Sequence, residues 1–65
     1  MTEVVQHPPH HMTQAELARY WRISARTLER WRADRRGPAW IRIGGRIIYR
    51  FEDVFAYERA HLEQP

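Results

Sequence analysis

The arginine side chains are the residues of this chain whose chemistry and placement point most directly to a ligand. Ten of the eleven basic residues lie between Arg19 and Arg50, a stretch in which Glu29 and Asp34 are the only acids. Ten positive against two negative charges give this stretch a formal +8, and one against six leaves −5 on the remaining residues. Guanidinium groups form bidentate hydrogen bonds with phosphate and guanine. The charge pattern therefore predicts a polyanion-binding surface in the middle of the chain.

Two of these arginines have the spacing of neighbours on one helix face. Arg26 and Arg30 are four residues apart, so they project together if the segment is helical. The sequence predicts a helix from about Ala25 to Arg35, ended by Gly37 and Pro38. Its inward positions are Leu28 and Trp31, with Thr27 beside them, and its outward positions are Ala25, Arg26, Glu29, Arg30 and Ala33.

Another arginine, Arg46, follows two glycines between runs of alternating apolar residues, in the sequence IRIGGRIIYR. This pattern predicts a β-hairpin. A two-residue turn would pair Ile43 with Arg46 and place an arginine in the apolar face. A three-residue loop of Gly44, Gly45 and Arg46 pairs Ile43 with Ile47 instead, so we expect this loop, with Arg46 at its tip. The expected core-facing residues are then Ile41, Ile43, Ile47, Tyr49 and Phe51, and the outward ones Trp40, Arg42, Ile48 and Arg50.

The remaining elements must position these arginines. Thr13 and Glu16 form a capping-box pattern that predicts a helix from about Thr13 to Trp21. A very short break follows, with Ser24 as the next N-cap. Acidic residues Glu52 and Asp53 introduce a last helix, which closes the core with Val54, Phe55, Ala56, Tyr57 and Leu62. The expected fold is mainly α with a small β-hairpin, a winged helix-turn-helix in the order helix, helix, two-stranded wing, helix.

Composition excludes several other classes of protein. The 65 residues contain no cysteine, so there is no disulfide framework, thiolate nucleophile or cysteine zinc site. The chain has neither the roughly 20 apolar residues of a membrane span nor a signal peptide, which predicts a soluble, cytoplasmic protein. There is no phosphate-binding glycine loop and no histidine and acid arranged around Ser24. We expect no enzyme activity, cofactor, metal, membrane contact or small-molecule substrate.

The amino terminus differs in composition from the rest. Pro8 and Pro9 favour an extended path, and no helical or strand period is present before Met12. We expect a flexible tail over residues 1–11 and one DNA-binding domain over residues 12–65. The histidines of this tail, His7, His10 and His11, are better explained as solvated groups than as metal ligands.

A helix with a basic face, preceded by a helix and a tight turn, predicts insertion into the major groove of duplex DNA. Arg26 and Arg30 are candidates for reading guanine, and Glu29 either accepts a hydrogen bond from cytosine or pairs with a neighbouring arginine. The candidate backbone contacts are Ser24, Thr27, Arg32, Arg35 and Arg36. Capping is the first role expected of Ser24, and helix packing is an alternative for Thr27. The run of arginines has the alternative of a solvated face.

The hairpin is then the wing, reaching the adjacent minor groove. Gly44 and Gly45 would let its backbone approach closely, and Arg46 would enter the negative potential of the groove. An ordinary solvent-exposed turn is the alternative. Trp21 and Trp31 are expected in the core, whereas Trp40 is expected to face outward, where it could stack on a base or contact a partner.

Two longer segments resemble a known family. MTQAELARYWRISARTLERWR and GPAWIRIGGRIIYRFEDVFAY are similar to excisionase and AlpA-type proteins, small winged helix-turn-helix members of the MerR-like superfamily. The resemblance spans about Met12 to Leu62. Its most specific parts are Ser24 to Trp31 and Arg42 to Arg46. The family usually has glycine where Arg22 stands, at a turn that needs a left-handed residue, so we expect either a strained Arg22 or a different turn.

The resemblance implies site-specific binding of double-stranded DNA, with Arg26, Thr27 and Arg30 at bases or backbone and Arg46 in the minor groove. It further implies DNA bending, self-association on adjacent sites and cooperation with a phage or mobile-element integrase during excision. An AlpA-like transcription regulator of a phage or mobile element is the alternative within the family. A protein-interaction module, such as a small phage packaging subunit using Trp40 and Ile48, is an alternative from another class.

Overall fold

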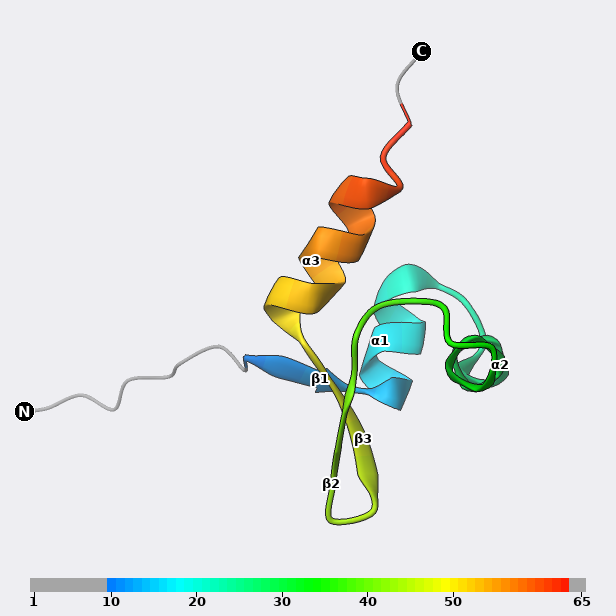
Figure 1. Cartoon of the computed structure of the whole chain (residues 1–65), viewed down its shortest axis with the longest axis vertical. Helices are drawn as coiled ribbons and strands as arrows, with labels where there is room; N and C mark the ends of the chain where they lie inside the picture. The colour runs from blue at the N-terminus through cyan, green and yellow to red at the C-terminus, as the bar shows by residue number, and fades with distance from the viewer. Residues whose placement is uncertain (1–9, 64–65) are drawn as a thin grey trace, which may run out of the picture.

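The computed structural model describes residues 10–63, which form three helices and a three-stranded antiparallel sheet (Figure 1). The elements in chain order are β1 (His11–Thr13), α1 (Gln14–Trp21), α2 (Ala25–Ala33), β2 (Ile41–Ile43), β3 (Arg46–Arg50) and α3 (Phe51–Ala60). The predicted fold class is confirmed. Most of the expected tail, including His7, lies outside the described residues, but His11 begins β1. No helix within residues 10–63 is long and apolar enough to cross a membrane.

Helix α1 begins and ends with the expected caps. Thr13 Oγ1 accepts from the Glu16 amide at 3.1 Å, and Glu16 Oε1 accepts from the Thr13 amide at 2.9 Å, which completes the capping box. At the other end Arg22 has the left-handed conformation, with φ of 60°. The Ile23 amide then donates to the Ala18 carbonyl at 2.9 Å, so the helix closes with a Schellman motif. Of the two alternatives expected at Arg22, the left-handed residue is observed and the different turn is not.

Helix α2 begins at the predicted cap but ends two residues early. Ser24 Oγ accepts from the Thr27 amide at 3.1 Å. Arg35, expected to be helical, instead has φ of 60°, and the Arg36 amide donates to the Trp31 carbonyl at 2.7 Å. This second Schellman-type closure ends the helix at Ala33. The turn after it brings Gly37 against the Trp31 ring.

The register of the wing was predicted wrongly. Ile43 pairs with Arg46, Arg42 with Ile47 and Ile41 with Ile48, so the turn contains Gly44 and Gly45 alone. Both glycines have positive φ, 59° and 78°, the conformation that a two-residue type I′ turn requires. Arg46 is therefore the first residue of β3 and not the tip of a loop. Ile43, expected in the core, is 56% exposed.

A third strand, β1, supplies part of the core-facing side of the sheet. It pairs antiparallel with the other edge of β3, with Met12 opposite Tyr49, and it was not predicted. β3 is thus the central strand of the order β1-β3-β2. Met12, Ile47 and Tyr49 provide the core-facing side, so burial of Ile41 and Ile43 is not needed. The Phe51 amide donates to the His10 carbonyl at 2.9 Å and holds β1 at the junction of β3 and α3.

The core lies where α1, α2 and α3 meet the inner face of the sheet. Its buried residues are Leu17, Ala18, Leu28, Tyr49 and Val54. Trp21 and Trp31 pack against it, as expected, and so does Ala25, which was placed on the outward face of α2 by prediction. Phe55, Ala56 and Leu62 were expected in the core and are exposed, because no element covers that side of α3.

Candidate nucleic-acid interface

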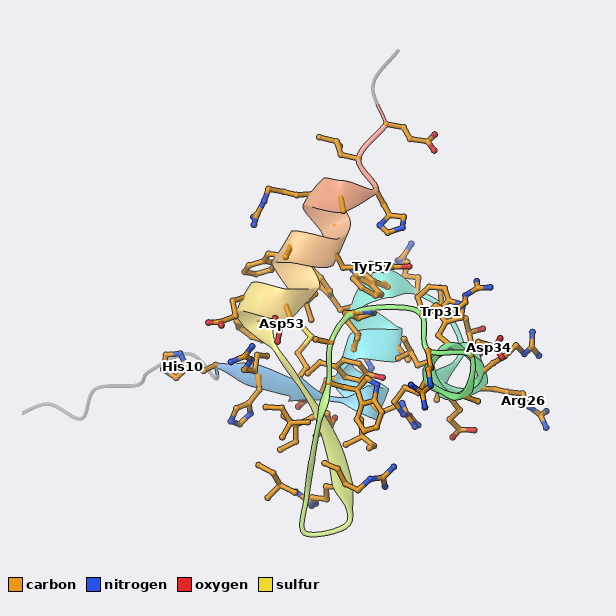
Figure 2. All side chains as sticks on the ribbon, in the orientation of Figure 1. His10, Arg26, Trp31, Asp34, Asp53 and Tyr57 are labelled. Atoms are coloured by element: carbon orange, nitrogen blue, oxygen red, sulfur yellow. The ribbon has the colours of Figure 1, made fainter. Side chains whose placement is uncertain are left out.

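The outward face of α2 carries the two arginines expected to act together. Arg26 and Arg30 are exposed, and within residues 10–63 neither guanidinium has a hydrogen bond, ion pair or ring contact. In Figure 2 the labelled side chain of Arg26 extends away from the rest of the molecule. Leu28 on the inner face is 1% exposed, which fixes the rotation of the helix. The outward face of α2 therefore offers two guanidinium groups to an external anion.

Glu29 lies on the flank of α2 that faces α1. Its carboxylate accepts a hydrogen bond from Gln14 Nε2 at 3.2 Å. No ion pair joins Glu29 to an arginine in the part of the chain that the structure describes, so the expected alternative of arginine pairing is not observed. Gln14 therefore orients one carboxylate oxygen of Glu29.

Ser24 and Thr27 lie at the amino end of α2. Their hydroxyl oxygens are 2.9 Å apart, and Ser24 Oγ also caps the helix, so the capping role expected of Ser24 is present. Ser24 is exposed and Thr27 is half-buried. Helix amino ends attract anions through their unpaired amides and their dipole. Ser24 is thus available at a position that favours phosphate.

Arg32 connects α2 to the sheet. Its Nη1 donates to the hydroxyl of the buried Tyr49 at 2.7 Å, and its guanidinium carbon lies 5.7 Å from the centre of the Trp40 ring. Arg42 lies 5.4 Å from the same ring on β2. Trp40 is 37% exposed, as expected for an outward residue, and it lies within cation–π distance of two guanidinium groups.

The two remaining arginines of the loop after α2 differ in their contacts. Arg36 lies 5.8 Å from the centre of the Trp31 ring. Arg35 is exposed, with no partner among the residues described. Together with Arg32 they line an open hollow of about 620 Å³ at the end of α2, which gives this end a positive rim.

The guanidinium group of Arg50 is paired with two carboxylates. Its Nε donates to Asp53 Oδ2 at 2.7 Å, and Nη1 lies 3.4 Å from Glu52. The hydrogen bond and charge of Asp53, followed by the charge of Glu52, raise the pKa of Arg50 above its ordinary value. Among the arginines of residues 10–63, Arg50 alone forms ion pairs, so no carboxylate of this region occupies the guanidinium groups of the others.

The wing presents its arginine beside an apolar side chain. Arg46 is exposed at the start of β3, directly opposite Ile43 across the hairpin. A Cβ atom added at Gly44 or Gly45 would meet no other atom within 4 Å, so the turn projects into open space. The wing end is therefore narrow.

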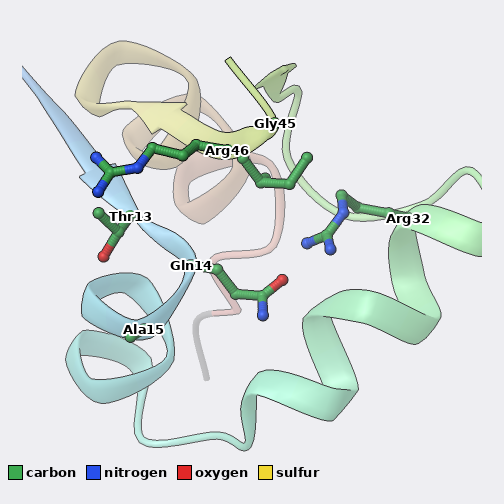
Figure 3. Close-up of a pocket in the computed structure, with 7 residues that line it drawn as sticks. Thr13, Gln14, Ala15, Arg32, Gly45 and Arg46 are labelled. Carbon is green, nitrogen blue, oxygen red and sulfur yellow. The ribbon is translucent and has the colours of Figure 1, made fainter. Parts of the chain in front are cut away.

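A hollow of about 370 Å³ separates the wing from α2 (Figure 3). It is lined by Thr13, Gln14 and Ala15 at the start of α1, Arg32 of α2, and Gly45, Arg46 and Ile47 of the wing. The sequence reasoning did not select Gln14, Ala15 or Arg42. Arg42 could have been found from its alternation with Ile41 and Ile43, but Gln14 reaches Glu29 only through the tertiary fold.

These features define the class of protein first: a winged helix-turn-helix with an arginine-rich second helix. Residues 12–61 match the model of the helix-turn-helix domain family, so the chain belongs to that family. No curated protein and no solved structure gives a significant match. Helix-turn-helix domains bind duplex DNA through the second helix, and this membership implies the same ligand here.

Proposed function

We propose that this protein binds a specific site in double-stranded DNA, with α2 in the major groove and the β2–β3 wing in the adjacent minor groove. The observation that carries the proposal is the pair of exposed guanidinium groups of Arg26 and Arg30, which have no partner within residues 10–63, on a helix anchored by Leu28. These groups read guanine O6 and N7, and each good bidentate contact discriminates by about 1–3 kcal/mol. Glu29, oriented by Gln14, accepts from the cytosine amino group.

The surrounding groups contact the sugar–phosphate backbone and set the position of α2. They are Ser24, Thr27, Arg32, Arg35 and Arg36. Gly44 and Gly45 allow the narrow wing end to approach the minor groove, where Arg46 supplies the positive charge. Simultaneous contact with two adjacent grooves favours a bent duplex.

The biological role that fits this surface is that of an excisionase or recombination directionality factor. Copies of the protein associate on adjacent sites, bend the DNA and direct a phage or mobile-element integrase toward excision, with no catalysis by the protein itself. This role rests on the sequence resemblance to excisionases. An AlpA-like transcription regulator of the MerR-like superfamily would use the same surface at a promoter, in the same bacterial cytoplasm.

A protein-interaction module is the candidate of another class. Ile48 pairs with Ile41, so it lies on the face of the hairpin opposite to Arg42 and Ile47. Trp40 lies beside Arg32 and Arg42, so it does not form one apolar surface with Ile48, and its surroundings are cationic, which favours a polyanion over an apolar partner. DNA binding is the function that the geometry supports best.

The proposal is tested by a gel-shift titration with attachment-site DNA of the host element, beside a scrambled duplex, at two salt concentrations. Stepwise cooperative complexes on the attachment site alone are expected. Specific binding at a promoter operator instead would assign the regulator role. Equal, salt-sensitive binding to both duplexes would reduce the arginine surface to a general polyanion patch. Absence of binding to any duplex would favour the protein-interaction module.

A further inference from the structure

We propose that a hollow beside the end of α3 is a binding site for a free organic cation with an alkylated ammonium group, which three aromatic rings enclose and Glu58 neutralises. The hollow has a volume of about 460 Å³ and lies between the end of α1, the turn after it, α2 and the end of α3. None of the residues proposed above to contact DNA lines it. The inference therefore goes beyond the proposed function and does not depend on it.

The aromatic walls of the hollow are the first argument. Trp21 ends α1, Trp31 belongs to α2 and Tyr57 to α3, and all three line the hollow. The ring centres of Trp21 and Trp31 are 6.5 Å apart, and the Tyr57 ring lies 5.5 Å from the first and 5.9 Å from the second. Figure 2 shows Trp31 and Tyr57 approaching each other between their helices. Several rings around one cavity are the arrangement that recognises quaternary ammonium groups.

The negative charge at the rim of the hollow is the second argument. Glu58 and Glu63 both line it, and no arginine of residues 10–63 forms an ion pair with either carboxylate. Glu58 is half-buried, and its Oε2 accepts a hydrogen bond from Trp21 Nε1 at 2.7 Å. This bond fixes the carboxylate at the edge of an aromatic wall, and the indole donor is neutral. A cation in the hollow would thus meet ring surfaces and an unneutralised carboxylate together.

The remaining walls indicate which kind of cation fits. Ile23 and Leu62 add aliphatic surface to the rings, so the hollow suits a ligand that has apolar atoms as well as a charge. A quaternary ammonium group has no N–H to satisfy, whereas an arginine side chain would bring several donors to walls with few acceptors. Small-molecule sites have volumes of about 300–1,000 Å³, and this hollow lies within that range. These properties favour a free alkylated ammonium compound over a basic side chain of another protein.

The test titrates the ¹⁵N-labelled full chain, at constant ionic strength, with choline and with its uncharged analogue, in which a tert-butyl group replaces the trimethylammonium group. The indole N–H resonances report the position of each probe, because Trp21 and Trp31 line the hollow and Trp40 does not. Choline should shift the first two saturably, leave Trp40 unmoved and bind about tenfold more tightly than the analogue. Equal affinity of the two probes, an equal shift of Trp40, or no saturable shift with choline would each overturn the proposal.

The charge of Glu58 is tested by Glu58→Gln, whose amide oxygen can still accept from Trp21. The matched control is Glu52→Gln, the same substitution at a position of α3 that does not line the hollow. Glu58→Gln should bind choline about threefold more weakly than Glu52→Gln, with no change for the uncharged analogue. Equal choline affinity of the two variants would overturn the site as proposed. If Glu58→Gln does not fold, the comparison of the two probes on the parent chain decides alone.

A third probe distinguishes a free cation from one carried by a protein. The amide of N-acetylarginine presents a guanidinium group on the side chain that a protein partner would supply, and it should bind more weakly than choline. Shifts of Trp21 and Trp31 with this probe and none with choline would reassign the hollow to a basic side chain and overturn the proposal. None of these titrations contains DNA, so their outcome is separate from that of the gel-shift titration.

Discussion

Helix α2 and the β2–β3 wing both carry exposed arginines, but they are held in different ways. α2 is anchored along its length: Leu28 is buried, and the Trp31 ring lies 6.5 Å from Trp21 and 5.9 Å from Tyr57. The wing is anchored only at its base, by Ile47 and the buried Tyr49. Within residues 10–63 no atom lies within 4 Å of a Cβ added at either turn glycine, and Ile43 beside the turn is more than half exposed.

This difference matches the two kinds of recognition that we propose. Hydrogen bonds to base edges require a fixed orientation, which a core-anchored helix supplies. Groove width and electrostatic potential can be followed by an element whose end is free to adapt. The hydrogen bond from Arg32 to Tyr49 joins the two regions at their common base. Variants of α2 should therefore change affinity and specificity most, and variants of the wing should act more weakly.

The largest expected effect is on DNA affinity when Arg26 and Arg30 are both replaced by alanine. Loss of two bidentate base contacts should cost about 2–6 kcal/mol of binding free energy on the specific site. The fold should be unchanged, because both side chains are exposed. Gel-shift titration measures the affinity, and Arg59→Ala on the exposed surface of α3 is the control for charge. Undiminished binding by the double variant would remove α2 as the recognition helix.

The next largest effect concerns the free energy of unfolding, and it compares two glycines. Gly37 has φ of 89°, and an added Cβ would lie 2.9 Å from the Trp31 ring. Gly37→Ala should cost about 1–3 kcal/mol of stability, because the strained backbone and the collision add. Gly45 also has positive φ, but a Cβ added there would meet no described atom within 4 Å, so Gly45→Ala should cost less stability. Thermal unfolding followed by circular dichroism measures both. Equal losses would mean that α2 is no more tightly held than the wing.

The same difference governs what the sequence could predict. The α2 cap at Ser24 and the buried Leu28 follow from local patterns, and both are observed. The wing register was available from the local Gly44-Gly45 signal of a type I′ turn, but the apolar alternation outweighed it in the prediction, and β1, a strand of three residues with no detectable period, was missed. The partner of Glu29 is likewise fifteen residues away, at Gln14. The DNA-contact roles of the arginines stay predictions.

A smaller effect is expected for Arg46→Ala. Removal of one minor-groove cation should reduce the salt slope of binding by about 1 and decrease the DNA bend angle, while α2 retains its base contacts. Stability should not change, because the side chain is exposed and has no partner within residues 10–63. Affinity and bend are measured by salt titration and circular-permutation gel shift, with Arg59→Ala as the charge control. An unaltered bend and slope would show that the wing does not enter the groove.

The smallest effect tests the wing register through two isoleucines. Ile43 is exposed opposite Arg46, whereas Ile47 packs against the core. Ile43→Thr should change the free energy of unfolding by less than about 0.5 kcal/mol. Ile47→Thr should lower it by about 1–2 kcal/mol, because a methyl group is lost from the packed side chain and a hydroxyl is partly buried. Threonine keeps the β-branch, so strand propensity is similar in both variants. In a three-residue loop the two isoleucines would instead face each other in the core. Comparable losses in chemical denaturation would then restore that register and return Arg46 to the tip of the wing.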